Sequence, residues 1–519
     1  MEDKDRYSIG QQDFKTLRDR GAFYIDKTAF IEKIVRSRTQ YYFLARPRRF
    51  GKSLFLSTLK YFFLGERELF KDLYIDNTKW YWEKYPVLHI DLNTSRYESI
   101  GLLENVLDRH FLEWENKYDV KVKNSDYSQR FATIIEAAHR KTGLRVVVLV
   151  DEYDKPLVGN LNKTENFEHY RSQLASIYSN FKSSSEHIRL VFLTGVSRFS
   201  KLSVFSDLNN LNDITFDNDF ADICGITGLE LKNDFHVGIK MLAEEYGIEY
   251  EAACGMLKRN YDGYRFAKKG SDIYNPWSLL NAMGKRDIRN YWSITGKPTI
   301  IAEALKRVDA DLEQVLSTRC AFRTLGGMDL SSPNPVALLY QTGYLTIKEY
   351  DRSSDTVTLG VPNNEVRQSL FEELLPYYVK LKHEDVVSVV FKILDAIRFG
   401  KPEEMMKNLD IYFAGIPYDL KIEDENNFQN AFYILLTLIG VEVQAEVHTS
   451  DGRIDILIEN REYIYIIELK YDVDPKEALY QINERQYSRK FSGDHRKIFR
   501  IGVNFSSKTR RIEGWQIEC

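Results

Sequence analysis

The sequence predicts an α/β fold in three parts. Residues 40–235 alternate short apolar runs with amphipathic stretches, the pattern of a parallel sheet covered by helices. The pattern then becomes mainly helical, and the last part reads helix, β-hairpin, helix. Since 519 residues exceed what one hydrophobic core holds, we expect domains at 1–235, 236–384 and 385–519.

The bulk composition indicates a globular cytoplasmic protein. It is 43% hydrophobic and 29% charged, with a net charge of −4. The polar N-terminus shows no signal peptide, and the longest aliphatic run, Val146–Val150, is far shorter than the ~20 residues that cross a membrane. Four widely spaced cysteines give no zinc pattern and fit a reducing compartment: Cys224, Cys254, Cys320 and Cys519.

The secondary structure of the first two parts follows from apolar patterning. The expected strands are Tyr41–Ala45, Val87–Asp91, Val146–Val150 and Arg189–Thr194, with covering helices at Leu54–Leu64 and Leu174–Phe181. Further along, Leu338–Tyr350 and Thr356–Val361 predict a helix end and a β-hairpin, and another helix follows from Asn364. This order is typical of a winged helix, which either docks on DNA or acts as an interdomain spacer; we favour the spacer.

A phosphate-binding loop is expected between the first strand and its helix. Backbone N–H groups at a helix N-terminus cradle phosphates, Lys52 would reach the β and γ oxygens of ATP, and Ser53 would ligate Mg²⁺. Arg46 replaces the first glycine of the usual motif. The expected nucleotide-binding residues of the loop are Arg48, Arg49, Phe50, Gly51, Lys52 and Ser53.

Two acids follow the strand Val146–Val150. Asp151 would hold Mg²⁺ and Glu152 would polarise the attacking water, although an acidic turn after a core strand is the plainer alternative. At the end of the next strand, Thr194 or Ser197 could contact the γ-phosphate.

Arg198 follows these polar residues and could neutralise charge in the transition state, in cis or across a boundary between identical subunits. Pairing with Asp207 or Asp213 is the alternative. A homo-oligomer therefore stays open.

The C-terminal part carries a carboxylate–lysine hairpin. A turn at Asn460-Arg461 would place Glu459 opposite Glu462 and Asp455 opposite Ile466. Glu468 would then be the diagonal neighbour of Asp455, and strand alternation puts both carboxylates and Lys470 on one face. Two converging acids can bind a divalent cation, with Lys470 beside it to steady developing charge. A plain Glu468–Lys470 ion pair is the alternative.

A basic stretch near the C-terminus could neutralise phosphates, although such a run is usually a solvated face. It holds nine Lys or Arg against one acid, Asp494. The basic residues are Arg485, Arg489, Lys490, Arg496, Lys497, Arg500, Lys508, Arg510 and Arg511.

Residues 8–215 resemble a bacterial AAA-ATPase-like family that is typically joined to a PD-(D/E)XK nuclease domain. The matching stretches are YIDKTAFI (24–31), ARPRRFGKS (45–53), LVDEYDKP (149–156) and TGVSRFSKLSVFSDLNNL (194–211), with YDGYRF (261–266) and YNPWSLLNAM (274–283) beyond them. The resemblance implies an AAA-type P-loop fold, and by analogy it places Asp26 and Lys27 near the nucleotide.

Residues 385–519 resemble the PD-(D/E)XK domain, a restriction-endonuclease-like α/β fold, in which Asp455, Glu468 and Lys470 match the motif. Such domains often take another acid from the preceding helix. Here the expected helix Phe428–Ile439 has none, and the nearby acids are Glu425, Glu442 and Glu446. Gln481 lies where related nucleases carry a supporting polar residue.

The preferred interpretation is an ATPase whose nucleotide state controls a Mg²⁺-dependent nuclease acting on DNA, with defence against foreign or mobile DNA as a suggested role. The main alternative is a nucleotide-regulated binding or signalling protein whose nuclease fold is inactive. A metabolic P-loop kinase is a weaker alternative, since nothing resembles a site for an acceptor substrate.

Overall fold

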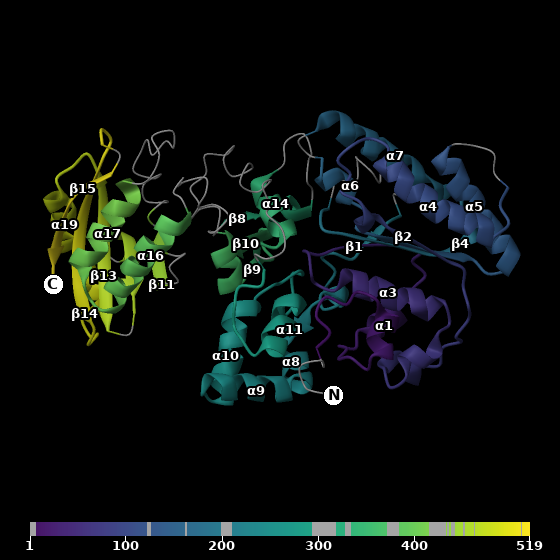
Figure 1. Ribbon diagram of the computed structural model, residues 1–519, viewed down its shortest axis with the longest axis horizontal. Helices are drawn as coiled ribbons and strands as arrows, with labels where there is room; N and C mark the ends of the chain where they lie inside the picture. Colours follow the sequence, from purple (N-terminus) through teal and green to yellow (C-terminus); the bar gives the residue numbers. More distant parts are fainter. Residues whose placement is uncertain are drawn as a thin grey trace. The chain divides into compact units, whose positions relative to one another are not determined.

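The chain forms two compact units in the computed structural model (Figure 1). Unit 1 comprises Met1–Ile294 and Ser317–Glu365, and unit 2 comprises Thr295–Leu316 and Val366–Cys519. The structure describes residues 7–121, 126–160, 163–198, 210–292, 318–326, 334–370, 383–414, 432, 435–436, 442–449, 452–460, 462–509 and 511–519.

The core of unit 1 is a five-stranded parallel sheet in the order β2-β3-β4-β1-β5. Its strands are β1 (Tyr41–Ala45), β2 (Val87–Asp91), β3 (Val146–Asp151), β4 (Ile188–Gly195) and β5 (Asn212–Asp213). The four expected strands are confirmed. Because β4 lies between β1 and β3, the loops that follow these three strands meet at one edge of the sheet.

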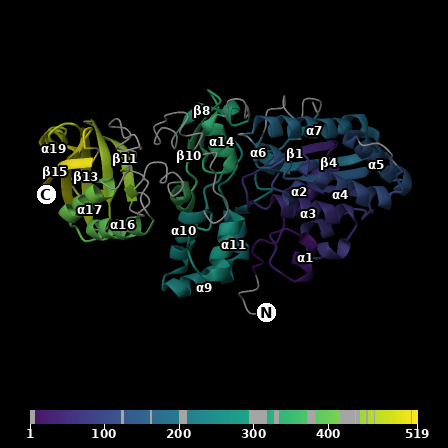
Figure 2. The ribbon, with the colours of Figure 1, turned by 45° about the horizontal axis from the view of Figure 1, so that its top comes forward.

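Helices cover both faces of this sheet, as Figures 1 and 2 show. One face carries α1 (Phe14–Asp19) and α3 (Lys52–Phe63), and the other carries α4 (Leu102–Lys117), α5 (Tyr127–Thr142) and α7 (Thr164–Ser183). The two expected covering helices lie in α3 and α7. Every residue of β1 and β3 is buried, which explains their unbroken apolar sequences.

The remainder of unit 1 is mainly helical and ends in a small sheet. The short elements around the main sheet are α2 (Thr28–Arg36), α6 (Lys155–Val158), β6 (Ile226–Thr227) and β7 (Ile273–Tyr274). The helices that follow the main sheet in the chain are α8 (Gly228–Asp234), α9 (His236–Tyr246), α10 (Tyr250–Tyr261) and α11 (Pro276–Lys285). Then come β8 (Arg319–Ala321), α14 (Pro335–Thr342), β9 (Thr346–Asp351) and β10 (Thr356–Gly360). The expected hairpin is confirmed, with β9 antiparallel to β10, and β8 adds a third strand.

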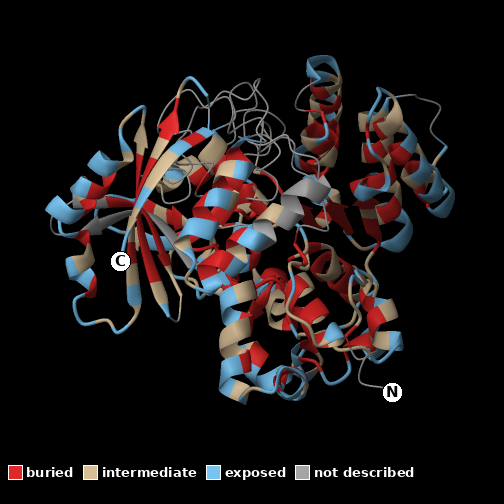
Figure 3. Cartoon of the chain, turned by 60° about the vertical axis from the view of Figure 1, so that its left-hand side comes forward, coloured by how far each residue is buried: buried red, intermediate tan, exposed pale blue. Residues whose placement is uncertain are grey.

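Unit 2 is built on a mixed sheet in the order β11-β12-β13-β14-β15. Its strands are β11 (Glu442–Thr449), β12 (Gly452–Glu459), β13 (Tyr463–Tyr471), β14 (Lys497–Ser506) and β15 (Arg511–Glu518), and its helices are α16 (His383–Arg398), α17 (Pro402–Ala414) and α19 (Pro475–Glu484). Among the strands that the structure describes in this sheet, only β13 and β14 run parallel to each other, and α19 makes the crossover between them. Figure 3 shows buried strands between helices with exposed outer faces.

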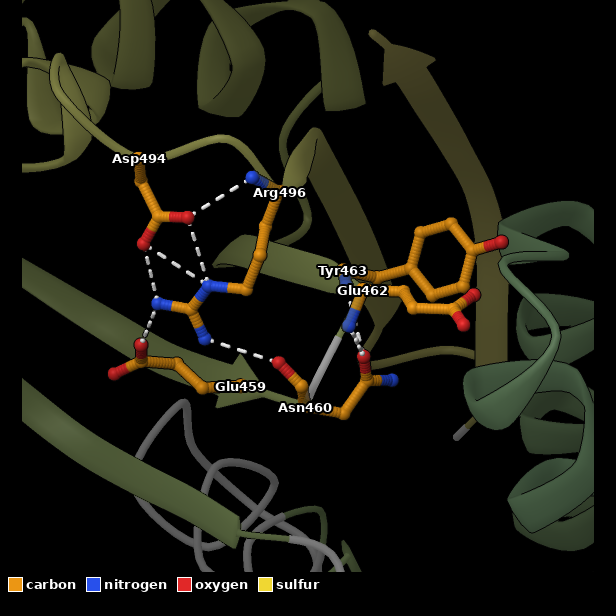
Figure 4. Close-up of polar contacts among 6 residues, drawn as sticks. All are labelled: Glu459, Asn460, Glu462, Tyr463, Asp494 and Arg496. Atoms are coloured by element: carbon orange, nitrogen blue, oxygen red, sulfur yellow. Dashed lines mark hydrogen bonds and ion pairs between the residues drawn. The ribbon is translucent and has the colours of Figure 1, made fainter.

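The expected register of the β12–β13 hairpin is wrong by two residues. Glu459 pairs with Ile464, not Glu462, and the pairing continues to Ile456 opposite Ile467. The turn is longer because the Asn460 side chain accepts the N–H groups of Glu462 and Tyr463 at 2.9 and 2.8 Å (Figure 4). A shift of two residues keeps every side chain on its expected face.

The composition led to two expectations, one about the cysteines and one about membrane-spanning segments. All four cysteines are free thiols. Among the helices that the structure describes, none has the length and apolar character needed to cross a bilayer.

Candidate functional sites

The loop between β1 and α3 has the backbone of a phosphate cradle. Gly51 adopts φ 94° and Arg49 adopts φ 68°, so the chain turns sharply before α3 begins at Lys52. A φ of this sign costs a non-glycine residue about 1–2 kcal/mol, which accounts for glycine at position 51. The first N–H groups of α3 have no partner within the helix and can donate to phosphate oxygens.

Arg46, which replaces the usual first glycine, is an internal anchor of this loop. Its guanidinium is buried and donates to the carbonyl oxygens of Ala45 and Thr215 at 2.9 and 2.8 Å and of Phe220 at 3.2 Å. It also lies 4.5 Å from the ring centroid of Phe266. Arg46 therefore ties the start of the loop to the segment after β5.

Two motifs that follow the main sheet in the chain, YDGYRF (261–266) and YNPWSLLNAM (274–283), also pack against the loop. Phe50 is fully buried and makes edge contacts with Tyr264 and Phe266, at centroid distances of 4.8 and 5.2 Å. The Arg49 guanidinium lies 3.6 Å from the ring of Trp277, and burial lowers its pKa to about 10. YDGYRF and YNPWSLLNAM thus act here as packing partners of the P-loop, while Arg48 is exposed.

Lys52 is held inside the cradle. Only 4% of the residue is exposed, and its Nζ donates to the carbonyl oxygens of Arg46 and Pro47 at 3.1 and 3.2 Å. Its Nζ also lies 3.5 Å from Oε1 of Glu152, so the expected phosphate ligand and the expected base form an ion pair. Incoming phosphates would offer Lys52 a stronger anionic partner and release Glu152.

Asp151 is the buried acid at the end of β3. Burial, together with the nearby Glu152 carboxylate, raises its pKa to about 6, and the Ser53 hydroxyl donates to it. Its Oδ1 has no hydrogen-bond partner among the residues that the structure describes, and the same holds for the buried Oγ1 of Thr194 on β4. A divalent cation and a phosphate oxygen are the groups that would satisfy these atoms.

Arg198 has partners outside this cluster. It forms an ion pair with Asp213, which the sequence left open as the alternative, and its guanidinium lies 5.1 Å from the ring of Phe216. Its backbone N–H donates to the Gln341 side chain on α14 at 2.9 Å. The transition-state role stays a prediction, and Asp207 lies outside the described residues.

Asp26 and Lys27 have structural contacts. Asp26 accepts the N–H of Thr28 at 2.8 Å and that of Tyr74 at 2.6 Å, which caps the start of α2. The Nζ of Lys27 pairs with Glu230 on α8 at 2.6 Å. These bonds fix the segment before α2 to the turn that begins at Tyr74 and to α8.

Asp154 is a candidate functional residue that the sequence did not single out. It is 1% exposed and accepts the N–H groups of Val196 and Ser197, at 3.1 and 2.5 Å, just beyond β4. Burial raises its pKa to about 6, and the Glu152 carboxylate adds to this. The sequence feature that could have indicated Asp154 is its position in LVDEYDKP, where it is an acid three residues after Asp151.

In unit 2 the carboxylate–lysine cluster lies on the face of the sheet that α19 covers. Continuing the register by one residue from Ile456 opposite Ile467 brings Asp455 opposite Glu468, closer than the expected diagonal. Lys470 contributes an Nζ at 3.2 Å from Oε1 of Glu468, so the alternative ion pair is present as well. The sequence therefore grouped these three residues correctly on one face.

Glu468 is the most deeply buried member of this cluster, at 1% exposure. Burial raises its pKa to about 7, and the like charge of Asp455 adds to this effect. Gln481 on α19 donates to Oε1, as the resemblance implied, whereas Oε2 has no partner within the described part of the chain. The Leu469 N–H donates to Asp455 at 2.9 Å, which orients the second carboxylate.

Neither cluster encloses a cation with protein ligands alone. Within the described residues no group of three or more His, Cys, Asp or Glu side chains could hold a metal ion. The orphaned oxygens of Asp151 and Glu468 fit Mg²⁺, which commonly binds one or two carboxylates and completes its shell with water and substrate phosphate. Of the nearby acids, Glu425 lies outside the described residues, and Glu442 and Glu446 lie on β11.

Part of the basic stretch has a structural role. Arg496 pairs with Asp494 and with Glu459, both at 2.6–2.7 Å, and donates to the Asn460 carbonyl at 3.0 Å (Figure 4). It therefore stabilises the hairpin turn and contributes little free charge. Arg500 likewise donates to Asn483, at 2.8 Å.

Comparison with known proteins matches both units. A family described as "Predicted AAA-ATPase" matches residues 8–205, and the PD-(D/E)XK nuclease superfamily matches residues 423–515. An uncharacterized protein in the vnfD 5′ region of Azotobacter chroococcum mcd 1 is 34% identical over 524 residues, which cover 98% of each chain. The chain belongs to this AAA-ATPase-like family with a C-terminal PD-(D/E)XK nuclease superfamily domain. The five-stranded parallel sheet is the AAA-ATPase-like part, and the mixed sheet of unit 2 lies in the PD-(D/E)XK part.

Replacing Lys52 tests the nucleotide site of the AAA-ATPase-like part. Lys52→Ala removes the buried cation that faces the phosphates, and it should abolish stabilisation by ATP, which is about 2.7 kcal/mol for a ligand at a hundred times its Kd. The measurement is the shift of Tm with ATP. Lys60→Ala, eight residues further along α3, is the matched control and should keep the full shift. An unchanged shift in Lys52→Ala would contradict the P-loop assignment.

The pKa of Glu468 predicts a pH dependence in the PD-(D/E)XK part. Its pKa rises from 4.5 to about 7 on folding, so the contribution of Glu468 to stability is greatest below pH 4.5 and decreases as pH rises through 7. The slope is at most about 1.4 kcal/mol per pH unit. Glu468→Gln should therefore reduce the loss of Tm between pH 5 and pH 8 in chelator-treated full-length protein. Glu477→Gln, at an exposed position on α19, is the control. Equal losses of Tm in the two variants would refute the raised pKa of Glu468.

Proposed function

We propose that the protein binds and hydrolyses ATP in unit 1 and cleaves DNA in unit 2, with the nucleotide state controlling cleavage. The observation that carries the proposal is shared by the two sites. Each site holds a buried carboxylate whose pKa is raised and which lies near a lysine. One oxygen of that carboxylate has no hydrogen-bond partner among the described residues. A divalent cation would satisfy the carboxylate oxygen at such a site, and a phosphate group would be an anionic partner for the lysine.

The side chains around Asp151 support ATP hydrolysis. Lys52 and the N–H groups at the start of α3 would bind the phosphates, and Thr194 would donate to a γ-phosphate oxygen. Glu152, released from Lys52, would accept a proton from water as the water oxygen forms its bond to the γ-phosphorus. The bond from that phosphorus to the β–γ bridging oxygen breaks, and ADP and phosphate leave.

The side chains of unit 2 support hydrolysis of a phosphodiester. Asp455 and Glu468 would hold the divalent cation. Lys470 would stabilise the charge on the phosphate as a water oxygen bonds to the phosphorus and the bond from the phosphorus to the leaving oxygen of the DNA strand breaks. Mg²⁺, when bound, supplies Lewis-acid activation of the phosphate and of water at both sites. Gln481 keeps Glu468 oriented throughout.

The remaining parts of the proposal concern organisation and partners. We propose three domains, 1–235, 236–384 and 385–519, with the part containing α14, β9 and β10 as a winged-helix-like spacer. DNA is the favoured partner because the basic stretch keeps cations such as Arg489 and Lys490, which form no ion pair with any acid that the structure describes. Defence against foreign or mobile DNA is the proposed setting.

A change at Glu152 tests turnover separately from binding. Glu152→Gln should still bind ATP but hydrolyse it about 100-fold more slowly, because an amide cannot accept the proton. Steady-state phosphate release and ATP-dependent Tm measure the two properties. Glu165→Gln, an exposed change at the start of α7, should keep the parent rate. Undetectable hydrolysis in the parent would favour a nucleotide switch over an ATPase.

Plasmid cleavage tests the second site. The full-length protein should cut DNA with Mg²⁺ or Mn²⁺, and the presence of ATP should change the rate. Asp455→Ala and Glu468→Ala should each eliminate cleavage and leave ATP binding intact, since they remove the cation ligands. Glu462→Ala, at the turn of the same hairpin, is the control. Cleavage that survives in Asp455→Ala would refute the site.

One outcome of the same experiment would support the alternative function. The Lys470–Glu468 ion pair compensates part of the buried charge without a metal, so this cluster is also compatible with a domain that does not cleave DNA. A parent protein that binds DNA but does not cut it with either metal would identify a nucleotide-regulated binding protein.

A further inference from the structure

The turn after β3 and the end of β4 are joined by several buried hydrogen bonds. The Tyr153 N–H donates to the Thr194 carbonyl at 3.0 Å, and the Tyr153 hydroxyl donates to the Ser197 carbonyl at 2.9 Å. The Asp154 carboxylate accepts the N–H groups of Val196 and Ser197. These bonds therefore hold the two segments against each other.

Gly195 allows this close approach. A Cβ at position 195 would lie 2.5 Å from Oδ1 of Asp154 and 2.6 Å from the Tyr153 ring, inside van der Waals contact. The carboxylate thus lies directly against the backbone of β4, where Gly195 has no side chain to displace it. Both residues are almost fully buried, at 1% exposure for Asp154 and 0% for Tyr153.

Glu152 depends on this junction for its conformation. It adopts φ 52°, the left-handed region, which costs a residue with a side chain about 1–3 kcal/mol unless the surroundings enforce it. The next two residues, Tyr153 and Asp154, provide the enforcing bonds. At the end of β4, the bonds from the N–H groups of Val196 and Ser197 to the Asp154 carboxylate fix the chain just after Thr194.

We propose that Asp154, assisted by Tyr153, is the positioning residue of ATP hydrolysis: it fixes Glu152 and Thr194 relative to each other across the γ-phosphate position. This inference rests on the proposed ATPase function. In this role the Asp154 carboxylate accepts the N–H groups of Val196 and Ser197 and acts through them, without touching the phosphate or the attacking water itself. Its effect is geometric, and a displacement of about 1 Å at a reacting group can cost about 100-fold in rate.

The test is a separation of kcat from KM in the full-length protein. Asp154→Ala should lower kcat for ATP hydrolysis by at least about tenfold and leave KM within about threefold, because the P-loop is unchanged. Asp154→Asn keeps a carbonyl oxygen that can accept the two N–H groups and should recover most of kcat. Tyr153→Phe, which removes the hydroxyl that donates to the Ser197 carbonyl, should lower kcat by about threefold at constant KM.

Asp126→Ala is the matched control, because Asp126 also accepts a backbone N–H, from Gln129 at 2.8 Å, but caps the distant helix α5. It should lower Tm without changing kcat. Parent-like kcat in Asp154→Ala, or a kcat that falls only in proportion to the folded fraction, would overturn the inference and leave the ATPase proposal standing. If Asp154→Ala does not fold, Tyr153→Phe decides, and a parent-like kcat in that variant overturns the inference. A parent without hydrolysis overturns both proposals.

Discussion

Burial of charge is the constraint on which both candidate sites depend. Lys52, Asp151 and Glu468 are each at most 5% exposed, and removing such groups from water costs several kcal/mol per ion unless a partner compensates. The compensation is partial in both units: Glu152 faces Lys52, Lys470 faces Glu468, and one carboxylate oxygen at each site stays without a described partner. Structural ion pairs usually satisfy their oxygens, so the residual demand favours sites made for a ligand.

The same constraint explains how the P-loop tolerates an arginine where a glycine is usual. The Arg46 guanidinium is buried in a set of backbone carbonyls and against Phe266, so it reinforces the outer side of the loop and does not enter the phosphate space. Within the loop, positive φ values are confined to positions 49 and 51. The cradle depends therefore on Gly51, and the substitution at position 46 leaves its geometry available.

The sequence predicted what local chemistry determines and missed what tertiary contacts determine. The strands of unit 1 were identified because buried parallel strands are continuous apolar runs, and β1 and β2 match to the residue. The hairpin register was missed because Asn460 and Arg496 set the turn through side-chain bonds that alternation does not show. The position of β4 between β1 and β3, and hence the role of Asp154, is a long-range property that no local pattern contains.

The P-loop is also in contact with the part of unit 1 that follows the sheet. A Cβ on Gly343, between α14 and β9, would lie 2.8 Å from Pro47 and 3.2 Å from Trp292, so this turn rests directly on the loop. Gln341 on the same helix accepts the N–H of Arg198, just beyond the end of β4. Close-packed contacts transmit displacements. The turn between α14 and β9 therefore touches the P-loop directly, and α14 itself is bonded to the chain just beyond β4, so one helix connects the two segments that border the candidate phosphate site.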